Sequence, residues 1–394
     1  MDRDIVSIDD DDIDGRWEMM NKPVTVIGMN EVGLATAADL TARGFAVTLF
    51  NSGLDDHLLK NKESGIYFNN EWVFPEPVTS DVEEALFASS LVLITESVNH
   101  IELLAEMCAP YLTDNHRVVF LGHGSLASIR WTRRLKELDV EANILVGETH
   151  LPPYETKYNE DTTEVELLLR TKKLLFSTYP VADNDEFFRG MRSVYPSIEK
   201  ATNSWEVLLN NLLPETVVAP LLSNLAKFDQ DDAHFQVYLD GLSPSVVNVI
   251  QEVDQERQKI CRALGLEAKN LERRLVETGY ARPLNELMEQ LKESDVLKKK
   301  SIVASDENAQ LMEGLHFAIV PWIELANMLE LETPTLNALL HIGSVSLDRL
   351  LVQEGLTLDK IGFFNETADS LIAAVQETSE QENDEETDEP QLLK

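Results

Sequence analysis

Short apolar runs alternate with helix-period segments over the first half of the chain. Residues 24–27 (Val-Thr-Val-Ile) and 45–50 (Phe-Ala-Val-Thr-Leu-Phe) are typical of buried strands, and residues 34–43 between them have helical spacing that ends at Gly44. Further strand-like runs cover residues 91–95, 117–121 and 144–146, and residues 164–169 and 173–178 predict a later strand pair. Alternation of this kind predicts a parallel sheet with helices on its faces.

The pattern changes near residue 203, beyond which helical spacing dominates. Helix-period segments cover residues 205–212, 243–264, 283–292, 317–329 and 333–351. Ser243-Pro244 is a favourable helix start, because serine caps a helix and proline is accepted in its first turn. We therefore predict an α/β protein, in which an N-terminal Rossmann-type parallel-sheet domain precedes an all-α C-terminal domain. The predicted limits are 21–202 and 203–376, with acidic disordered tails at 1–20 and 377–394.

The charge of the chain excludes some classes of partner. The formal net charge is −37, which repels nucleic acid and anionic membrane surfaces. No apolar run reaches the roughly 18 residues of a membrane span, and the acidic start does not look like a secretory signal. We expect a cytoplasmic protein without nucleic-acid or membrane partners.

No metal site is predicted. Cys108 and Cys261 lie far apart without metal-ligand spacing, and are expected to be isolated thiols. Residues 10–15 match the first positions of an EF-hand calcium loop, but its twelfth position, where a bidentate glutamate is needed, holds Asn21.

The turn after the first predicted strand resembles a dinucleotide fingerprint. It reads Gly28-Met29-Asn30-Glu31-Val32-Gly33, against Gly-x-Gly-x-x-Gly. Gly28 and Gly33 match, whereas Asn30 replaces the middle glycine, and its side chain is expected to project toward the phosphate position. Glu31 adds a negative charge at a helix start that should receive an anion.

The end of the next strand is the second cofactor position. NAD enzymes place Asp or Glu there to hold the ribose hydroxyls, and this chain has Asn51. An NADP site needs a nearby cation, and the nearest are Lys60 and Lys62. The candidate cofactor residues are therefore those of the turn together with Asn51, for NAD or NADP.

Several segments from residue 22 to residue 364 resemble the NAD(P)-dependent octopine/nopaline (opine) dehydrogenases. They are the opening at 22–50, Gly-Glu-Thr-His-Leu-Pro-Pro-Tyr at 147–154, Leu-Asp-Gly-Leu-Ser-Pro-Ser-Val at 239–246, Asp-Gln-Glu-Arg at 254–257, Thr-Pro-Thr at 333–335 and Gly-Leu-Thr-Leu-Asp-Lys-Ile-Gly at 355–362. The resemblance implies reductive condensation of an α-keto acid with the amine of an amino acid, using NADH or NADPH.

The family's catalytic signature, roughly Asn-x-Asn-Pro-x-x-His-Pro with an asparagine further on, corresponds to residues 211–224. Asn211, Pro214 and Asn224 occupy its framework positions. Leu213 stands at the second asparagine, and Val217 stands at the histidine. A valine neither carries a proton nor polarises a carbonyl group.

The other two catalytic positions of the family are replaced as well. Its Arg-x-x-x-Glu-Asp segment corresponds to residues 309–314, where the arginine is Ala309 and the aspartate is Gly314. Only Glu313 matches. No catalytic residue is thus assignable from the signature, and the remaining acid–base candidates are Glu313, His123 after a predicted strand, and His150 in the 147–154 segment.

Two functions are open at this point. One is a divergent oxidoreductase that acts on a keto acid and an amino acid with an acid–base group elsewhere than residue 217. The other is a pseudoenzyme, a scaffold that binds a ligand or a protein partner, either as a homodimer or paired with an active paralogue. The acidic tails suit the second function, although they occur in proteins of any class.

Overall fold

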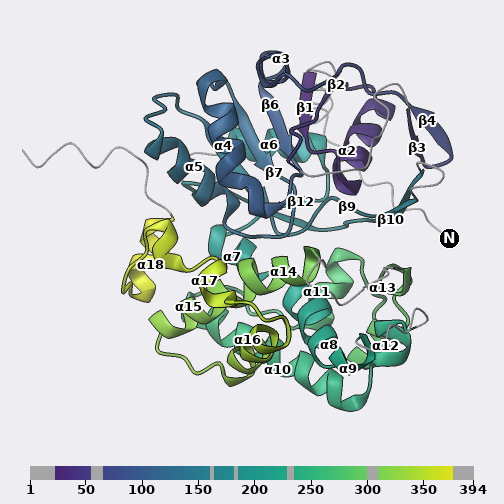
Figure 1. Cartoon of the computed structure of the whole chain (residues 1–394), viewed down its shortest axis with the longest axis vertical. Coiled ribbons are helices and arrows are strands. Elements are labelled where there is room, and N and C mark those ends of the chain that lie inside the picture. Colours follow the sequence, from purple (N-terminus) through teal and green to yellow (C-terminus); the bar gives the residue numbers. More distant parts are fainter. Residues whose placement is uncertain are drawn as a thin grey trace, which may run out of the picture.

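The computed structural model describes residues 23–54, 65–159, 164–181, 185–228, 235–299 and 309–375. Figure 1 shows two lobes: an α/β lobe from the first half of the chain above a helical lobe from the second half. The tails with the partial EF-hand pattern, and Lys60 and Lys62, lie outside the described residues. No helix in the described part of the chain is long and apolar enough to span a bilayer.

The α/β lobe is built on an eight-stranded sheet in the order β12-β11-β8-β7-β6-β1-β2-β5. The strands are β1 (Pro23–Ile27), β2 (Ala46–Phe50), β5 (Val78–Thr79), β6 (Leu91–Ile94), β7 (Arg117–Phe120), β8 (Leu145–Thr149), β11 (Leu174–Tyr179) and β12 (Ile198–Lys200). From β5 to β8 all pairings are parallel, with Val24 opposite Val47 and Leu91. Strand order therefore reverses between β1 and β6, as in a Rossmann-type fold.

The predicted strand pair at 164–169 and 173–178 is wrong, because the two strands belong to different sheets. β11 runs antiparallel to β8 in the main sheet, which makes that sheet mixed. β10 (Glu164–Arg170) instead joins β9 (Tyr154–Asn159), β3 (Ile66–Phe68) and β4 (Glu71–Val73) in a four-stranded sheet of order β4-β3-β10-β9. Sequence periodicity identifies strands but not their neighbours.

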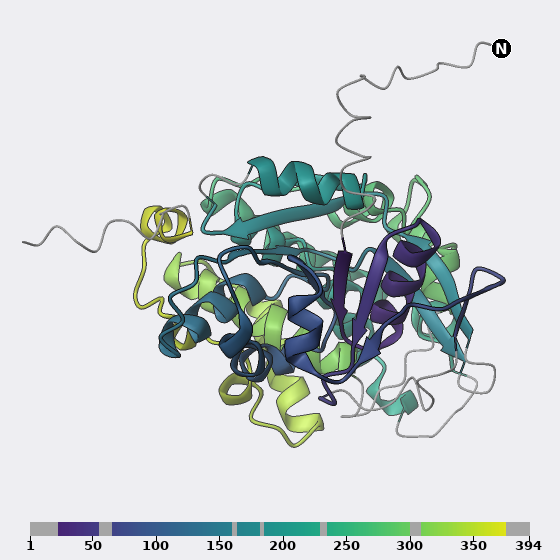
Figure 2. The same ribbon diagram turned by 90° about the horizontal axis from the view of Figure 1, so that it is seen from above.

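Helices cover both faces of the main sheet. α2 (Glu31–Ala42) and α6 (Asp185–Val194) share one face, where Arg43 at the end of α2 donates to the carbonyl of Val194 at 2.7 Å. α3 (Val82–Phe87), α4 (Ile101–Cys108) and α5 (Ala127–Glu137) pack together in sequence on the other face. Figure 2, from above, shows α6 in teal on the opposite side of the sheet from the blue helices.

The helical lobe follows β12. Its elements are α7 (Ser204–Leu209), η3 (Pro214–Val218), α8 (Ala219–Leu222), α9 (Leu225–Phe228), η4 (Val237–Gly241), α10 (Pro244–Ala263), α11 (Leu271–Thr278), α12 (Leu287–Lys292), α13 (Asp295–Lys299), α14 (Ala309–Gly314), η5 (Leu315–Ile319), α15 (Val320–Met328), α16 (Pro334–Ser346), α17 (Leu351–Glu354), η6 (Leu358–Ile361) and α18 (Ala368–Ala374). η3, η4 and η5 are single π-helical turns, which interrupt α-helices at functional sites in many proteins.

Helix α10 organises the helical lobe through its buried charges. The Asp254 carboxylate accepts a hydrogen bond of 2.9 Å from the backbone N–H of Leu271, at the start of α11. The Glu256 carboxylate accepts from the N–H groups of Thr335 and Leu336, at 2.8 and 2.9 Å, at the start of α16. Both carboxylates thus cap other helices, where the helix dipole favours a negative charge.

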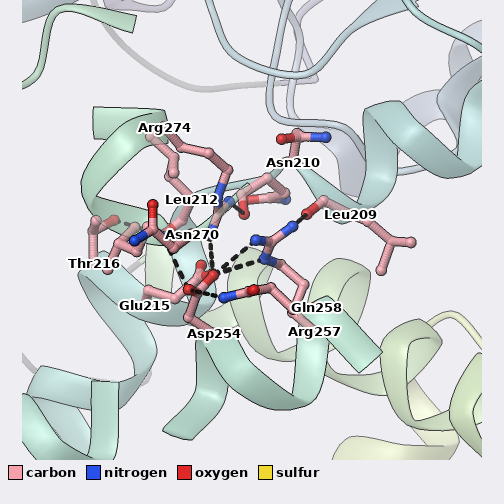
Figure 3. Close-up of polar contacts among 12 residues, drawn as sticks. Leu209, Asn210, Leu212, Glu215, Thr216, Asp254, Arg257, Gln258, Asn270 and Arg274 are labelled. Carbon is pink, nitrogen blue, oxygen red and sulfur yellow. Dashed lines mark hydrogen bonds and ion pairs between the residues drawn. The ribbon is translucent and has the colours of Figure 1, made fainter. Parts of the chain in front are cut away.

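A buried ion cluster joins α10 to α11 and η3 (Figure 3). Arg257 is 2.8 Å from Asp254, and Arg274 is 3.1 Å from the same oxygen. Glu215 on η3 accepts from Arg274 and lies 3.4 Å from Arg257. Although burial alone raises a carboxyl pKa, the charges of the two arginines hold the pKa of Asp254 below its ordinary value. The cluster fixes the position of η3 relative to the rest of the lobe.

The two lobes meet through buried contacts. The Asn211 side chain donates to the carbonyl of Gly124 at 3.1 Å, and the Arg130 guanidinium lies 4.7 Å from the centre of the Phe317 ring. Because apolar residues of both lobes form one continuous core, the lobe junction is packed rather than hinged. The domain limits given from the sequence, with a boundary near residue 203, stay a prediction.

Replacing Asp254 by asparagine is expected to destabilise the protein by about 3–5 kcal/mol, because Arg257 and Arg274 then share one carboxylate in the interior. The measurement is urea unfolding. Asp295→Asn is the control, since its ion pair with Arg282 is 72% and 76% exposed and should contribute less than about 1 kcal/mol. Equal losses in the two variants would contradict the role given to the cluster.

Candidate functional site

The turn between β1 and α2 keeps the geometry for which the fingerprint glycines are needed. Gly28 has φ +121°, and a Cβ there would lie 2.5 Å from the hydroxyl oxygen of Thr95. A Cβ on Gly33 would overlap the carbonyl oxygen of Gly28. Glycine is therefore required at both positions, one for the turn and the other for close packing of helix on strand.

The Asn30 side chain caps the start of α2, which is where the fingerprint places the phosphate. Asn30 has φ −75° and ψ 177°, an extended conformation open to any residue. Its side-chain oxygen accepts from the N–H of Gly33 at 2.9 Å, and its side-chain nitrogen donates to the carbonyl of Thr95. Asparagine is a preferred N-cap residue, so its amide satisfies a helix N–H that an anion would otherwise take.

The Glu31 carboxylate, on the first residue of α2, lies against β9. It accepts from the backbone N–H of Tyr158 at 3.3 Å and lies 3.5 Å from the hydroxyl of Thr156. The other two residues of the turn are Met29, which is buried in the core, and Val32, which is half-buried. Glu31 thus ties the helix start to the second sheet.

The end of β2 has no carboxylate residue of its own, but the carboxylate of a residue that follows β6 reaches the end of β2. The Asn51 side chain accepts from the N–H of Gly53 at 3.0 Å and so closes its own turn. The Ser52 hydroxyl donates to Glu96, a buried residue just beyond the end of β6. Sequence reasoning missed Glu96; its position after a predicted strand was the only available signal.

A small hollow lies where β6, β7 and β8 end. Its volume is about 20 Å³, room for one or two water molecules. Glu96, His123, Ser125 and Glu148 supply its polar lining, and the rest is mainly apolar. The structure thus places His123 at the edge of the sheet, as its position after a strand predicts.

Glu148 is a second residue that sequence reasoning missed. It is 1% exposed, and it accepts from the Ala127 N–H at 3.0 Å and from the Ser128 hydroxyl at 2.7 Å. Burial raises the pKa of this carboxyl, although these hydrogen bonds oppose the shift. Glu148 caps α5, and it is the glutamate of the 147–154 segment that resembles the family, although it was not singled out as a candidate.

The three positions that the family signature gives to His, Asp and its second Asn are buried here, and two of them, Gly314 and Leu213, lie in contact. Val217 is 3% exposed and Leu213 is 2% exposed, both at η3. A Cβ on Gly314 would lie 2.6 Å from Val218 Cγ2 and 3.2 Å from Leu213 Cβ. An aspartate at 314 therefore has no room, and the replacements are mutually consistent in packing.

Ala309, at the family's arginine position, and Glu313, the one matching residue of that segment, both lie on α14. Ala309 is the exposed first described residue of that helix, and Glu313 is half-buried near its end. Neither lines the hollow at the sheet edge. His316, one turn further, is 3.7 Å from Glu354, and burial lowers its pKa.

His150 is held as a neutral imidazole. Its Nδ1 accepts from the N–H of Leu175 at 3.0 Å, so the ring proton belongs on Nε2. Burial, followed by the charges of Arg274, His123 and Lys173, lowers its pKa to about 3. A group with that pKa does not deliver a proton near neutral pH. It lines a second small hollow with Arg274 and Asn210, between the lobes.

A dinucleotide does not fit these residues as they stand. The Gly33 N–H is engaged by Asn30, and the nearby carboxylates of Glu31 and Glu96 repel a pyrophosphate. Among the described residues lining the hollow at the sheet edge there is no lysine or arginine. The backbone of the turn has the shape that a dinucleotide needs, but the side chains around it do not have the charge that a pyrophosphate needs. In the described part of the chain no group of three or more His, Cys, Asp or Glu is placed to hold a metal.

The two-lobed architecture is similar to that of the opine dehydrogenases. Residues 200–347 match the family model described as NAD/NADP octopine/nopaline dehydrogenase, alpha-helical domain. The opine dehydrogenase of Arthrobacter sp. (strain 1C) is 24% identical over 362 residues, covering 90% of this chain and 99% of that protein. The chain is thus similar to the octopine/nopaline dehydrogenases over most of its length, which confirms the resemblance drawn from the sequence.

Solved structures agree in fold. Octopine dehydrogenase in complex with NADH and agmatine matches with a TM-score of 0.68 at 16% identity, covering 89% of this chain and 98% of that chain. Yersinopine dehydrogenase in its NADP⁺-bound form matches with a TM-score of 0.63 at 14% identity, covering 91% and 98%. The predicted order of a Rossmann-type lobe followed by a helical lobe is confirmed.

Gly314→Ala is expected to destabilise the protein by about 1–3 kcal/mol, because its methyl group overpacks the contact with Val218. Combining it with Val218→Ala should cost less than the sum of the single changes by more than about 0.5 kcal/mol. Urea unfolding of the four proteins measures both. Gly122→Ala is the control, since a Cβ there meets nothing within 4 Å. Additive losses would contradict the packed contact.

His150 gives a prediction for pH. A base whose pKa is depressed in the folded state takes up its proton on unfolding, so it contributes stability above pH 6.5 that is lost as pH falls toward about 3. The loss is up to about 1.4 kcal/mol per pH unit. His150→Gln, whose amide oxygen still accepts from Leu175, should flatten urea-unfolding stability between pH 6 and 4.5. An unchanged slope would show that His150 is not buried and neutral.

Proposed function

We propose that this chain is an opine-dehydrogenase scaffold that acts by binding and does not carry out the reductive condensation of its family. One observation carries the proposal: the contact of Gly314 with Val218 and Leu213, which leaves no room for an aspartate where the signature has one. Val217, at the histidine position of the signature, is buried and cannot move a proton.

The nucleotide turn supports the same reading. The relatives include structures with NADH and with NADP⁺. In this chain Asn30 satisfies the helix N–H, and carboxylates flank the turn. Because a buried anion needs compensating donors or cations, a pyrophosphate binds poorly here. We therefore assign this chain neither NAD nor NADP as a working cofactor.

A second function is favoured by the position of His123. It lines the hollow at the ends of β6 and β7, beside Glu96 and near Glu148. A divergent dehydrogenase would use this imidazole as its acid–base group in place of residue 217, acting on a keto acid and an amine. It would still have to bind a nucleotide at the turn.

Turnover separates the two functions. NADH and NADPH oxidation is followed by absorbance with pyruvate plus L-arginine or agmatine, compounds present in octopine dehydrogenase complexes. We expect no rate above the enzyme-free blank, while the opine dehydrogenase of Arthrobacter, assayed with its own substrates, shows that the assay works. A rate that is lost in a folded His123→Ala variant would overturn the proposal and identify the second function.

A further inference from the structure

The hollow between the two lobes lies apart from the nucleotide turn. Its volume is about 20 Å³, and its described lining includes no residue of the turn at 28–33 and no residue at the family's catalytic positions. Residues next to β8 and β11 line it from the α/β lobe, and α7 and α11 line it from the helical lobe. Figure 3 shows Arg274, Asn210 and Leu212 of this lining beside the buried ion cluster. The cofactor and catalytic motifs therefore do not account for this hollow.

Two N–H groups in the lining have no protein acceptor among the described residues. The Nδ1 of His150 accepts from the N–H of Leu175, which leaves the ring proton on Nε2. The Nε of Arg274 is buried without a hydrogen-bond partner, although another nitrogen of this guanidinium donates to Glu215 and Asp254. The side chains of His150 and Arg274 belong to residues that are each 3% exposed. Because a buried donor without an acceptor is costly, both groups favour an acceptor atom that the protein itself does not supply.

The hollow also has a positive side. The side chains of Lys173 and Lys269 are 18% and 14% exposed, and their ammonium groups lie 3.5 and 2.9 Å from the Glu277 carboxylate. Each lysine has one further carboxylate partner, at 2.5 and 3.2 Å. Since a lysine ammonium has three N–H groups, each lysine keeps one beyond these two ion pairs. Together with Arg274, three cations therefore line the hollow.

The three carboxylates of the lining are offset by cations or donors of the protein. Glu277 is paired with both lysines, and Glu267, which is 57% exposed, is paired with Lys269. Glu206 accepts from the backbone N–H of Thr202 at 2.6 Å. Their repulsion of an anion is therefore reduced, while the N–H groups described above still need an acceptor.

We infer that this hollow binds one small oxyanion, a carboxylate or a phosphate group, held by His150 Nε2 and Arg274 Nε together with the two lysines. An oxyanion accepts from several donors and brings no hydrogen that needs an acceptor, whereas a water molecule must donate its own two. The hollow has room for one or two water molecules, so the ligand is compact and a whole nucleotide is excluded.

A bound oxyanion would connect the two lobes. His150 and Lys173 belong to the α/β lobe, whereas Arg274 and Lys269 belong to the helical lobe. Only the folded chain brings these residues together, so binding stabilises the folded state. Through Arg274 the anion also adjoins the ion cluster that holds η3.

Histidine-selective ¹⁵N NMR of the full chain, titrated with sodium acetate and separately with sodium phosphate, tests the inference. The added salt replaces sodium chloride at constant ionic strength, because a protein of net charge −37 responds to salt in general. The Nε2 signal of His150, identified by its absence in His150→Gln, should shift and saturate with a dissociation constant in the millimolar range. Saturation with acetate alone identifies a carboxylate ligand, with phosphate alone a phosphate ligand, and with both a site for either.

Two lysine variants test the positive side of the hollow. Lys173→Met removes a cation but keeps an unbranched side chain, and it should raise the dissociation constant roughly threefold or more. Lys200→Met is the matched control, since its ion pair with Asp185 lies outside the hollow, and it should bind as the unmodified protein does.

Thermal melting provides a second readout through His150. Acetate or phosphate, whichever binds, should raise the melting temperature of the unmodified protein. The rise should persist in His150→Gln, whose amide can both accept from Leu175 and donate to the ligand, and it should be lost in His150→Leu. Circular dichroism checks that each variant is folded.

Absence of a saturable His150 shift with either anion up to about 100 mM would overturn the inference, because the hollow would then hold water only. So would a folded Lys173→Met variant with unchanged affinity, since the anion would then bind elsewhere. The outcome is independent of the proposed function, because neither nucleotide binding nor turnover is measured.

Discussion

The buried ion cluster of Glu215, Asp254, Arg257 and Arg274 is the constraint on which the helical lobe depends. It joins α10, α11 and η3, and its charges are so deeply buried that none can lose its partner without a large cost. Since Glu215 is two residues before Val217, the cluster fixes η3 whatever residue stands at 217. The position of η3 is therefore set by these charges and not by the side chain at 217.

Two further side chains hold the framework of the fold. Asn211 still joins the lobes through Gly124, and the carboxylate of Glu256 still caps α16. Leu213, Val217 and Gly314 are buried, and Gly314 packs against Leu213 and Val218. An apolar contact of matched shape avoids the cost of leaving a polar group without a partner in the interior.

Much of the fold follows from local pattern. Strands β1, β2, β6 and β7, the two required glycines of the turn, and α10 with its Ser243 cap all lie where periodicity and end signals predict. The separation of β10 from β11 could not be predicted, because strand pairing depends on contacts distant in sequence. The positions of the strands are therefore easier to predict from the sequence than the way in which the strands pair.

The candidate site was less predictable than the fold. The sequence shows that residue 30 is not glycine, but only the structure shows that its amide accepts the N–H of Gly33. Glu96 and Glu148 act through residues far along the chain, Ser52 and Ser128, and a motif does not show such partners. His123 follows a predicted strand and lines the hollow at the sheet edge, where strand ends meet, while its acid–base role stays a prediction. Site residues that act through long-range partners leave little trace in a single sequence.

The central claim is that the backbone of a nucleotide turn survives without its function. Calorimetric titration of the purified protein with NADH tests it most directly, because binding is measured whether or not any chemistry follows. The account predicts no saturable heat up to millimolar nucleotide, since Asn30 and the carboxylates of Glu31 and Glu96 oppose the pyrophosphate. Saturable binding at micromolar NADH would contradict it.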